Sequence, residues 1–236
     1  MTDIAQNQKQ KNQKIKKNTT EETKDEGPSK GFDRGIDYKA MKERLINEYD
    51  NLLGKYHALD ECDRYYGSKK TKICRNMIYL LVAMIQLANG SRVTEACSAL
   101  KLFLNRGYDD KVVVIIAKSK STKYKDGKAY ITKTRYRKMK FPSSWINAEH
   151  TLDPGPDVFL EYLDNIENLE KYTLNYMLRH FDCNTHSLRY AFINFMLYDQ
   201  KKEMTVVAKH VGHKNIQQLI TYTQNKESDK LFDIDI

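Results

Sequence analysis

The sequence has few cysteines, and none of them is spaced as in a disulfide framework or a zinc site. Its 236 residues contain four, Cys62, Cys74, Cys97 and Cys183, without a CxxC or CxxxC pair. Small secreted domains depend on many paired cysteines, so this composition is more typical of a reducing cytoplasm. His57 together with Cys62 and Cys74 is only a weak zinc candidate, and we expect no metal site and no cofactor.

The chain also lacks a long apolar run, a signal peptide and internal repeats. The most apolar stretch, residues 77–88, includes Gln86 and is shorter than the roughly 20 residues that cross a bilayer. Nothing near the N-terminus resembles a secretory signal. We therefore expect a cytoplasmic protein with no membrane partner.

Large apolar residues are almost absent from residues 1–35, which are rich in Lys, Gln, Asn, Thr and Glu. Such a segment cannot offset its ordering entropy by burial, so we expect a disordered polar tail. Its lysines either contact a polyanion or only keep the chain soluble. Residues 36–66 have helical apolar spacing and form a short N-terminal helical segment, and residues 67–236 form the main domain.

Acidic residues are scarce in one region of a chain whose net charge is +9. Residues 111–140 contain eleven lysines and arginines against Asp126 alone, so the rest of the chain is close to neutral. A concentrated basic patch is typical of a protein that binds a polyanion such as double-stranded DNA. A solvated basic face is the simpler alternative. The predicted DNA contacts are Lys120, Lys123, Lys125, Lys128, Lys133, Arg135 and Arg137.

The apolar pattern predicts an α+β fold that is mostly helical, with a small antiparallel β-hairpin. Residues 72–88 are apolar on nearly every side, which indicates a central helix. Asn89-Gly90 ends it, and Ser91 can cap the next helix. Residues 112–118 and 129–139 predict two strands joined at a turn. Further helices are expected over 154–169, 170–180 and 205–210.

Three short motifs follow one another between residues 185 and 224. His186 and Arg189 lie three apart, so on a helix that begins near Thr185 they share one face. Val211-Gly212-His213 predicts a break between helices. Residues 216–222, capped by Asn215, would form a short helix that presents Tyr222.

Together these motifs resemble the C-terminal signature of the tyrosine recombinases, which include phage integrases and compact integrases of archaeal viruses and plasmids. The signature is HxLR, then (V/L)GH, whose histidine lies 24 residues after the arginine, then a tyrosine nine residues further on. Taken singly, the residues have simpler interpretations: His186 is structural, Arg189 is a salt-bridge partner, and Tyr222 is one of 16 tyrosines. The joint spacing favours the family.

The resemblance extends upstream to two further residues. Family members carry their first catalytic arginine in a GxRxxE turn, and Gly90-Ser91-Arg92-Val93-Thr94-Glu95 matches this at Gly, Arg and Glu. A catalytic lysine follows a strand such as 112–117, which implies Lys118, with Lys120 as the alternative because the hairpin here is long and rich in lysine. Residues 67–236 then correspond to the catalytic domain, and residues 36–66 stand where most members have a core-binding domain.

The resemblance implies a complete reaction. Arg92 and Arg189 would neutralise a DNA phosphate, His213 would donate a hydrogen bond to it, and His186 would take the proton of the nucleophile Tyr222. Lys118 would protonate the leaving 5′-oxygen. The product is a 3′-phosphotyrosyl enzyme, formed without metal or ATP.

The expected protein is therefore a site-specific recombinase or integrase that acts as a homotetramer on DNA and can be monomeric in isolation. Two alternatives remain: a type IB topoisomerase-like nicking-closing enzyme and a DNA-binding relative without catalysis. The last fourteen residues either dock on a neighbouring protomer or pack on their own chain.

Overall fold

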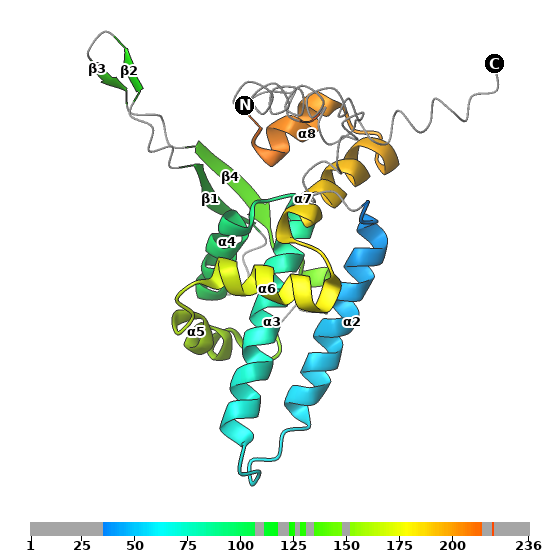
Figure 1. Cartoon of the computed structure of the whole chain (residues 1–236), viewed down its shortest axis with the longest axis vertical. Helices are drawn as coiled ribbons and strands as arrows, with labels where there is room; N and C mark the ends of the chain where they lie inside the picture. Colours follow the sequence, from blue (N-terminus) through cyan, green and yellow to red (C-terminus); the bar gives the residue numbers. More distant parts are fainter. Residues whose placement is uncertain are drawn as a thin grey trace, which may run out of the picture. The chain divides into compact units, whose positions relative to one another are not determined.

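The computed structural model describes residues 35–106, 111–117, 123–125, 128–130, 135–147, 152–213 and 219. For residues 111–117, 123–125, 128–130 and 135 it describes the backbone only. Within these ranges the protein is mostly helical with two short antiparallel strand pairs (Figure 1), which confirms the predicted fold class.

Helix α3 (Tyr66–Asn89) is the centre of the fold. Every residue from 77 to 87 is buried, as its uniformly apolar sequence predicts. By length and composition alone α3 is apolar enough to cross a membrane, but 67% of its most apolar window is covered by the rest of the protein. The helix is longer than the apolar run in the sequence because it begins with a polar turn, and its burial identifies it as a core helix.

Helix α2 (Tyr38–His57) lies beside α3 (Figure 1) and belongs to the same hydrophobic core. Asp37 caps it, accepting a hydrogen bond of 2.7 Å from the Ala40 amide. Its buried residues recur every three or four positions: Met41, Leu45, Tyr49 and Leu52. The segment 36–66 therefore contains one long helix that completes the core.

The predicted hairpin is divided into two strand pairs. Strand β1 (Lys111–Ala117), which follows α4 (Val93–Arg106), pairs with β4 (Arg135–Lys140), and β2 (Lys123–Lys125) pairs with β3 (Lys128–Tyr130). The single strand expected over 129–139 is thus two strands. Residues alternate along β4, so that Arg137 and Met139 face the core while Tyr136, Lys138 and Lys140 are exposed.

The C-terminal half supplies helices α5 (Pro156–Asp164), α6 (Leu169–Phe181), α7 (Thr185–Asn194) and α8 (Met204–Val211), besides short helical segments η2 (Ser143–Trp145) and η3 (Phe195–Asp199). The helix expected over 154–169 ends at Asp164, because Asn168 caps a new helix by accepting from the Lys171 amide at 3.0 Å. A second apolar cluster joins α7 to α8 and contains Phe192, Ile193, Val207, Ala208, Val211 and Leu219. Of the predicted helix 216–222 only Leu219 is described, and it is helical and buried.

Candidate active site

The turn between α3 and α4 has little room for any residue but glycine at position 90. Gly90 ends α3 in the left-handed conformation, with φ of 57°. A Cβ atom there would lie 2.2 Å from Cδ1 of Phe192, a residue of α7. Glycine therefore satisfies both the backbone conformation and the close packing, and the turn that carries Arg92 is pressed against α7.

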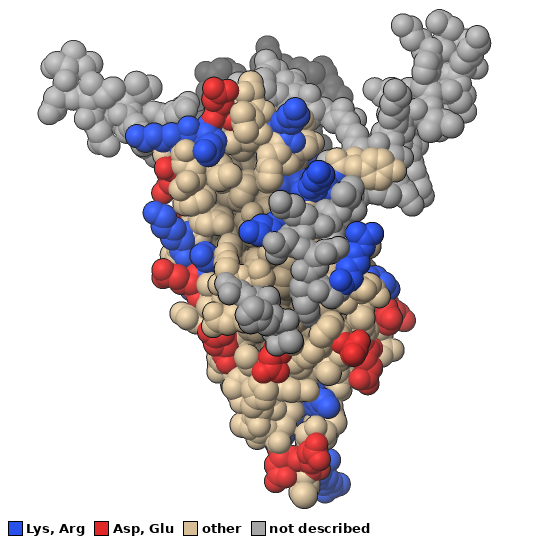
Figure 2. Space-filling model, turned by 180° about the vertical axis from the view of Figure 1, so that it is seen from behind, with Lys and Arg blue, Asp and Glu red and all other residues tan. Residues whose placement is uncertain are grey.

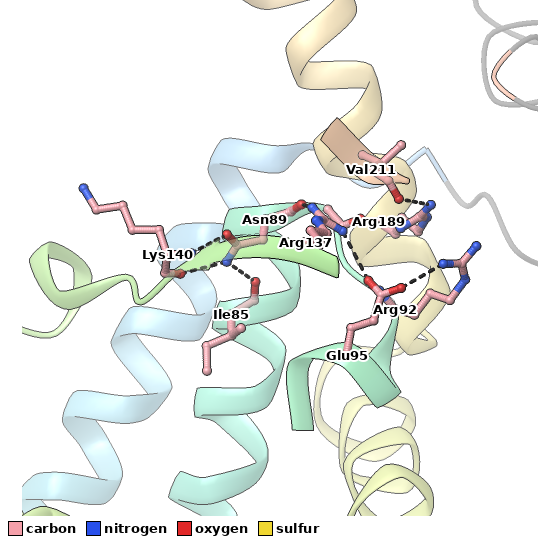
Figure 3. A network of polar contacts seen from close by, with 9 residues as sticks. Ile85, Asn89, Arg92, Glu95, Arg137, Lys140, Arg189 and Val211 are labelled. Atoms are coloured by element: carbon pink, nitrogen blue, oxygen red, sulfur yellow. Dashed lines mark hydrogen bonds and ion pairs between the residues drawn. The ribbon is translucent and has the colours of Figure 1, made fainter. Parts of the chain in front are cut away.

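Arg189, in the HxLR motif, connects it to the GxRxxE turn and to the VGH motif. Its side chain is 1% exposed, and Nη1 donates to the carbonyl oxygen of Gly90 at 2.7 Å while Nη2 donates to that of Val211 at 2.9 Å. One accepting carbonyl lies two residues before Arg92 and the other two residues before His213. Figure 3 shows the bond from Arg189 to Val211. The planar guanidinium thus holds both turns against α7.

Helix α7 begins where the sequence indicates. Asn184 accepts a hydrogen bond of 3.0 Å from the Ser187 amide and so caps the helix. The Val211-Gly212-His213 break is also as predicted, since Gly212 has φ of 73° and the His213 amide donates to the Ala208 carbonyl at 2.9 Å. His213 is thereby fixed directly after α8, and its side chain is half-buried.

Glu95 holds Arg92 from one side. The carboxylate is almost wholly buried and accepts from the Arg92 amide at 3.1 Å and from Arg92 Nη1 at 2.8 Å. Glu95 is the third residue of α4, and by accepting from the Arg92 amide it caps the helix N-terminus as in a capping box. The Ser91 hydroxyl, expected to cap, makes no hydrogen bond with the described residues. The Arg92 side chain remains 44% exposed, so one edge is fixed and the other faces solvent.

Arg137 is not on the surface, and its predicted role as a DNA contact is wrong. Because it faces inward on β4, it is 6% exposed and forms an ion pair with Glu95, Nη1 to Oε2 at 3.2 Å. Its Nη2 also donates to the carbonyl oxygen of Asn89. Burial lowers the pKa of Arg137 to about 10, and the nearby Arg189 and Arg92 contribute to this, while Glu95 opposes it. The guanidinium is still charged at neutral pH.

The exposed side of β4 offers two other basic groups, Lys138 and Lys140. Tyr136 lies on the same side and is 64% exposed. Figure 2 shows that lysine and arginine are more frequent toward the part of the molecule with β4 and α8, and aspartate and glutamate toward the α2–α3 turn.

His186 lies in the first turn of α7, half-buried and edge-on to Tyr190 with ring centroids 5.1 Å apart. Burial lowers its pKa, and the charges of Arg189 and Arg92 lower it further. The neutral ring is therefore favoured at pH 7, in the form that can accept a proton. The influence of both arginines also indicates that His186 shares their surroundings.

His210 belongs to the same surroundings but was not predicted from the sequence. Its ring stacks on that of Phe192, with ring centroids 5.5 Å apart, although the residue as a whole is exposed. Burial first, then Arg137 and Arg189, lower its pKa, while a hydrogen bond to the Asn89 backbone opposes the shift. The available signal was its place in the last turn of α8, three residues before His213 in the sequence.

Several predicted residues lie outside the part of the chain that the structure describes: Lys118, Lys120, Lys133 and Tyr222. Lys123, Lys125, Lys128 and Arg135 lie in strands, with only their backbone described. Among the described residues, no group of three His, Cys, Asp or Glu side chains is placed to hold a metal ion.

Comparison with known proteins places the chain among integrases, although no protein-family model matches it. It is 39% identical over 210 residues to "Putative integrase V10" of Sputnik virophage, across 87% of this chain and 90% of that protein. It is 27% identical over 203 residues to "Putative integrase ORF241" of Acidianus two-tailed virus, across 86% of this chain and 68% of that protein.

Among solved structures, the chain is similar to the XerH site-specific recombinase bound to its difH substrate, with a TM-score of 0.45 and 15% identity, over 86% of this chain and 54% of that one. The identity to V10 over nearly its whole length, together with the HxLR, VGH and GxRxxE motifs, establishes the relationship. The chain belongs to the tyrosine recombinase, or integrase, family.

Proposed function

We propose that the protein is a site-specific integrase that cleaves and rejoins double-stranded DNA through a 3′-phosphotyrosyl intermediate on Tyr222, without metal or ATP. The observation that most directly supports this is the pair of bonds from Arg189 to the carbonyls of Gly90 and Val211. Those bonds bring Arg92 and His213, which are 121 positions apart in the sequence, to the same guanidinium.

The charge balance of this cluster suits a phosphodiester. Among the described residues, Arg92 and Arg137 both contact the Glu95 carboxylate, and Arg189 is near enough to Arg137 to lower its pKa. This leaves an excess of positive charge in a largely buried place. A bound phosphate would offset that excess. The more exposed Arg92 reaches the phosphate directly, and Arg189 acts from beneath mainly through its charge, because it is 1% exposed.

The proposed chemical step balances without a further reactant. The Tyr222 phenol oxygen attacks the phosphorus and forms a phosphotyrosyl ester at the 3′ end, while the bond to the 5′-oxygen breaks. His186 accepts the phenol proton, for which its neutral ring is suited, and Lys118 gives a proton to the leaving oxygen. His213 donates a hydrogen bond to the phosphate. The phosphate remains a diester, so the reverse attack by another 5′-hydroxyl rejoins the strand.

The proposed partners are duplex DNA and further copies of this chain, four on a pair of sites. The basic residues of the β2–β3 hairpin and the exposed lysines of β4 would contact DNA phosphates, which makes binding strongly dependent on salt.

A pool of nicked duplexes with a randomised central sequence tests the proposal. A nick just downstream of the cleaved phosphate lets the short fragment with the free 5′-hydroxyl diffuse away, which traps the covalent complex. The wild-type protein should give a covalent protein–DNA band, and Tyr222→Phe should give none while it still binds DNA. Tyr65→Phe is the matched control, since Tyr65 is 59% exposed near the α2–α3 turn and should leave the band unchanged.

Other outcomes identify the alternatives. A band that persists in Tyr222→Phe shows that the nucleophile is another residue. Relaxation of supercoiled plasmid without strand exchange between selected sites indicates a nicking-closing enzyme. Binding without any covalent band in the wild type indicates a relative that has lost catalysis.

A further inference from the structure

Asn89, the last residue of α3, fixes β4 to the turn that carries Arg92. Its side-chain amide donates to the Lys140 carbonyl at 2.8 Å, and its side-chain oxygen accepts from the Lys140 amide at 2.8 Å. A second bond from the same amide, 2.8 Å to the Ile85 carbonyl, holds the side chain against α3. Position 89 thus pairs with β4 much as a neighbouring strand would (Figure 3).

Arg137 makes a second connection from β4 to this turn. Its Nη2 donates to the backbone carbonyl of Asn89, and its Nη1 to Oε2 of Glu95. The same Oε2 accepts from the Arg92 amide, whereas Oε1 accepts from Arg92 Nη1. Glu95 is therefore shared between two arginines. The side chain of Arg137 is 4% exposed and that of Arg92 is 44% exposed.

We propose that Arg137 is a positioning residue for Arg92: it holds the Glu95 carboxylate in place and offsets its charge, so that Arg92 stays oriented and available to the DNA phosphate. This inference rests on the proposed function. A phosphate must compete with Glu95 for Arg92, and the competition is weaker when Glu95 already has a second guanidinium partner.

The absence of Arg137 has a definite consequence. With glutamine at position 137, the buried Glu95 has Arg92 as its remaining arginine partner, so Arg92 is drawn more strongly toward it. Replacing Glu95 by glutamine as well removes the competing charge and keeps an acceptor for Arg92. The double variant should therefore recover cleavage that the single variant loses.

The experiment uses the full chain and a nicked duplex recovered from the covalent complexes that the wild-type protein forms with the randomised pool. It measures DNA affinity, the single-turnover rate of covalent-complex formation at saturating DNA, and the melting temperature, with kinetics well below that temperature. The variants are Arg137→Gln, Arg137→Lys and Arg137→Gln/Glu95→Gln. Arg179→Gln, an exposed arginine near the end of α6, is the matched control for the loss of one positive charge.

A displaced catalytic group slows the chemical step far more than it weakens binding, so we expect Arg137→Gln to cleave about 10- to 100-fold more slowly with affinity changed less than about threefold. The double variant should cleave at least about threefold faster than Arg137→Gln, and Arg179→Gln as fast as wild type. Arg137→Lys keeps the charge without the two-donor fork, and should be slower than wild type by about three- to tenfold.

Wild-type rates in both Arg137→Gln and Arg137→Lys would overturn the inference, as would a double variant that is slower than Arg137→Gln. Equal losses of rate and affinity in folded Arg137→Gln would assign Arg137 a purely structural role. If Arg137→Gln does not fold, Arg137→Lys decides. Failure of the wild type to form any covalent complex is a different result, which contradicts the proposed function itself.

Discussion

Replacing Gly90 by alanine tests the packing on which the candidate active site depends. The residue has a positive φ of 57°, and its carbonyl accepts a hydrogen bond from Arg189. An added methyl group would lie 2.2 Å, 2.8 Å and 2.9 Å from three atoms of the Phe192 ring. The ring is part of the apolar cluster that joins α7 to α8, so it has little freedom to move away.

The expected loss of stability has two parts. A left-handed conformation costs a residue other than glycine about 1–2 kcal/mol. Forcing a methyl group into a packed interior costs about 1–3 kcal/mol more. The free energy of unfolding should therefore fall by about 2–5 kcal/mol, a large part of the 5–15 kcal/mol typical of a domain.

Gly54 provides the matched control. It lies inside α2 with no atom within 4 Å of an added Cβ and no positive φ. Alanine there should raise the free energy of unfolding by about 0.5–1 kcal/mol, because glycine is unfavourable within a helix. Urea denaturation of both variants measures the difference. A loss of less than about 1 kcal/mol in Gly90→Ala would contradict this expectation, because both costs would then be absent.

Two further predictions concern α7. Asn184→Ala removes the cap and should lower the free energy of unfolding by about 1 kcal/mol in urea denaturation. Asn184→Asp keeps an acceptor and should lose less. Equal losses in the two variants would show that the capping hydrogen bond does not account for the loss. Burial, Arg189 and Arg92 lower the pKa of His186 below its ordinary 6.5, so protonation costs the folded state more than the unfolded state. The free energy of unfolding is therefore unaffected by His186 above pH 6.5, and it decreases as the pH falls from 6.5 through the folded pKa. If His186 is the base, the acidic limb of the single-turnover rate profile should lie below pH 6.5 and match an NMR titration of the ring; a limb above pH 6.5 would contradict this.

Much of the fold follows from local patterns that need no partner. The uniformly apolar sequence of α3, the start of α7 near Thr185 and the Gly212 break could be predicted because each depends on neighbours within a few residues. The HxLR and VGH motifs were also recognisable, since their spacing is fixed by the chain itself. The bonds from Arg189 to the carbonyls of Gly90 and Val211, which connect these motifs in space, become visible only in the folded protein.

Other features could not be predicted because they depend on contacts between distant segments. The prediction for Arg137 failed since the basic residues of 111–140 were interpreted together as one patch, although alternation along β4 turns this one inward. Asn89 was interpreted as part of a turn, yet its side chain pairs with the β4 backbone 51 residues away. Ser91 was expected to cap α4, but Glu95 performs that role from within the helix.

The failure at Arg137 has a physical meaning. A domain selected for stability alone would gain little from placing two guanidiniums on one buried carboxylate with a third arginine nearby, because burying charge is costly unless every charge is paired. Here burial and the neighbouring arginines lower the pKa of Arg137 to about 10, so the folded state holds this proton less tightly than a free arginine does. Under the proposed function, a bound phosphate would offset part of this excess positive charge. A protein whose task is to stabilise a phosphate in a transition state gains from that arrangement, since the positive field is in place before the DNA arrives. Under the proposed function, the residue at which a simple surface interpretation is wrong is thus one whose charge keeps Arg92 available to the anion.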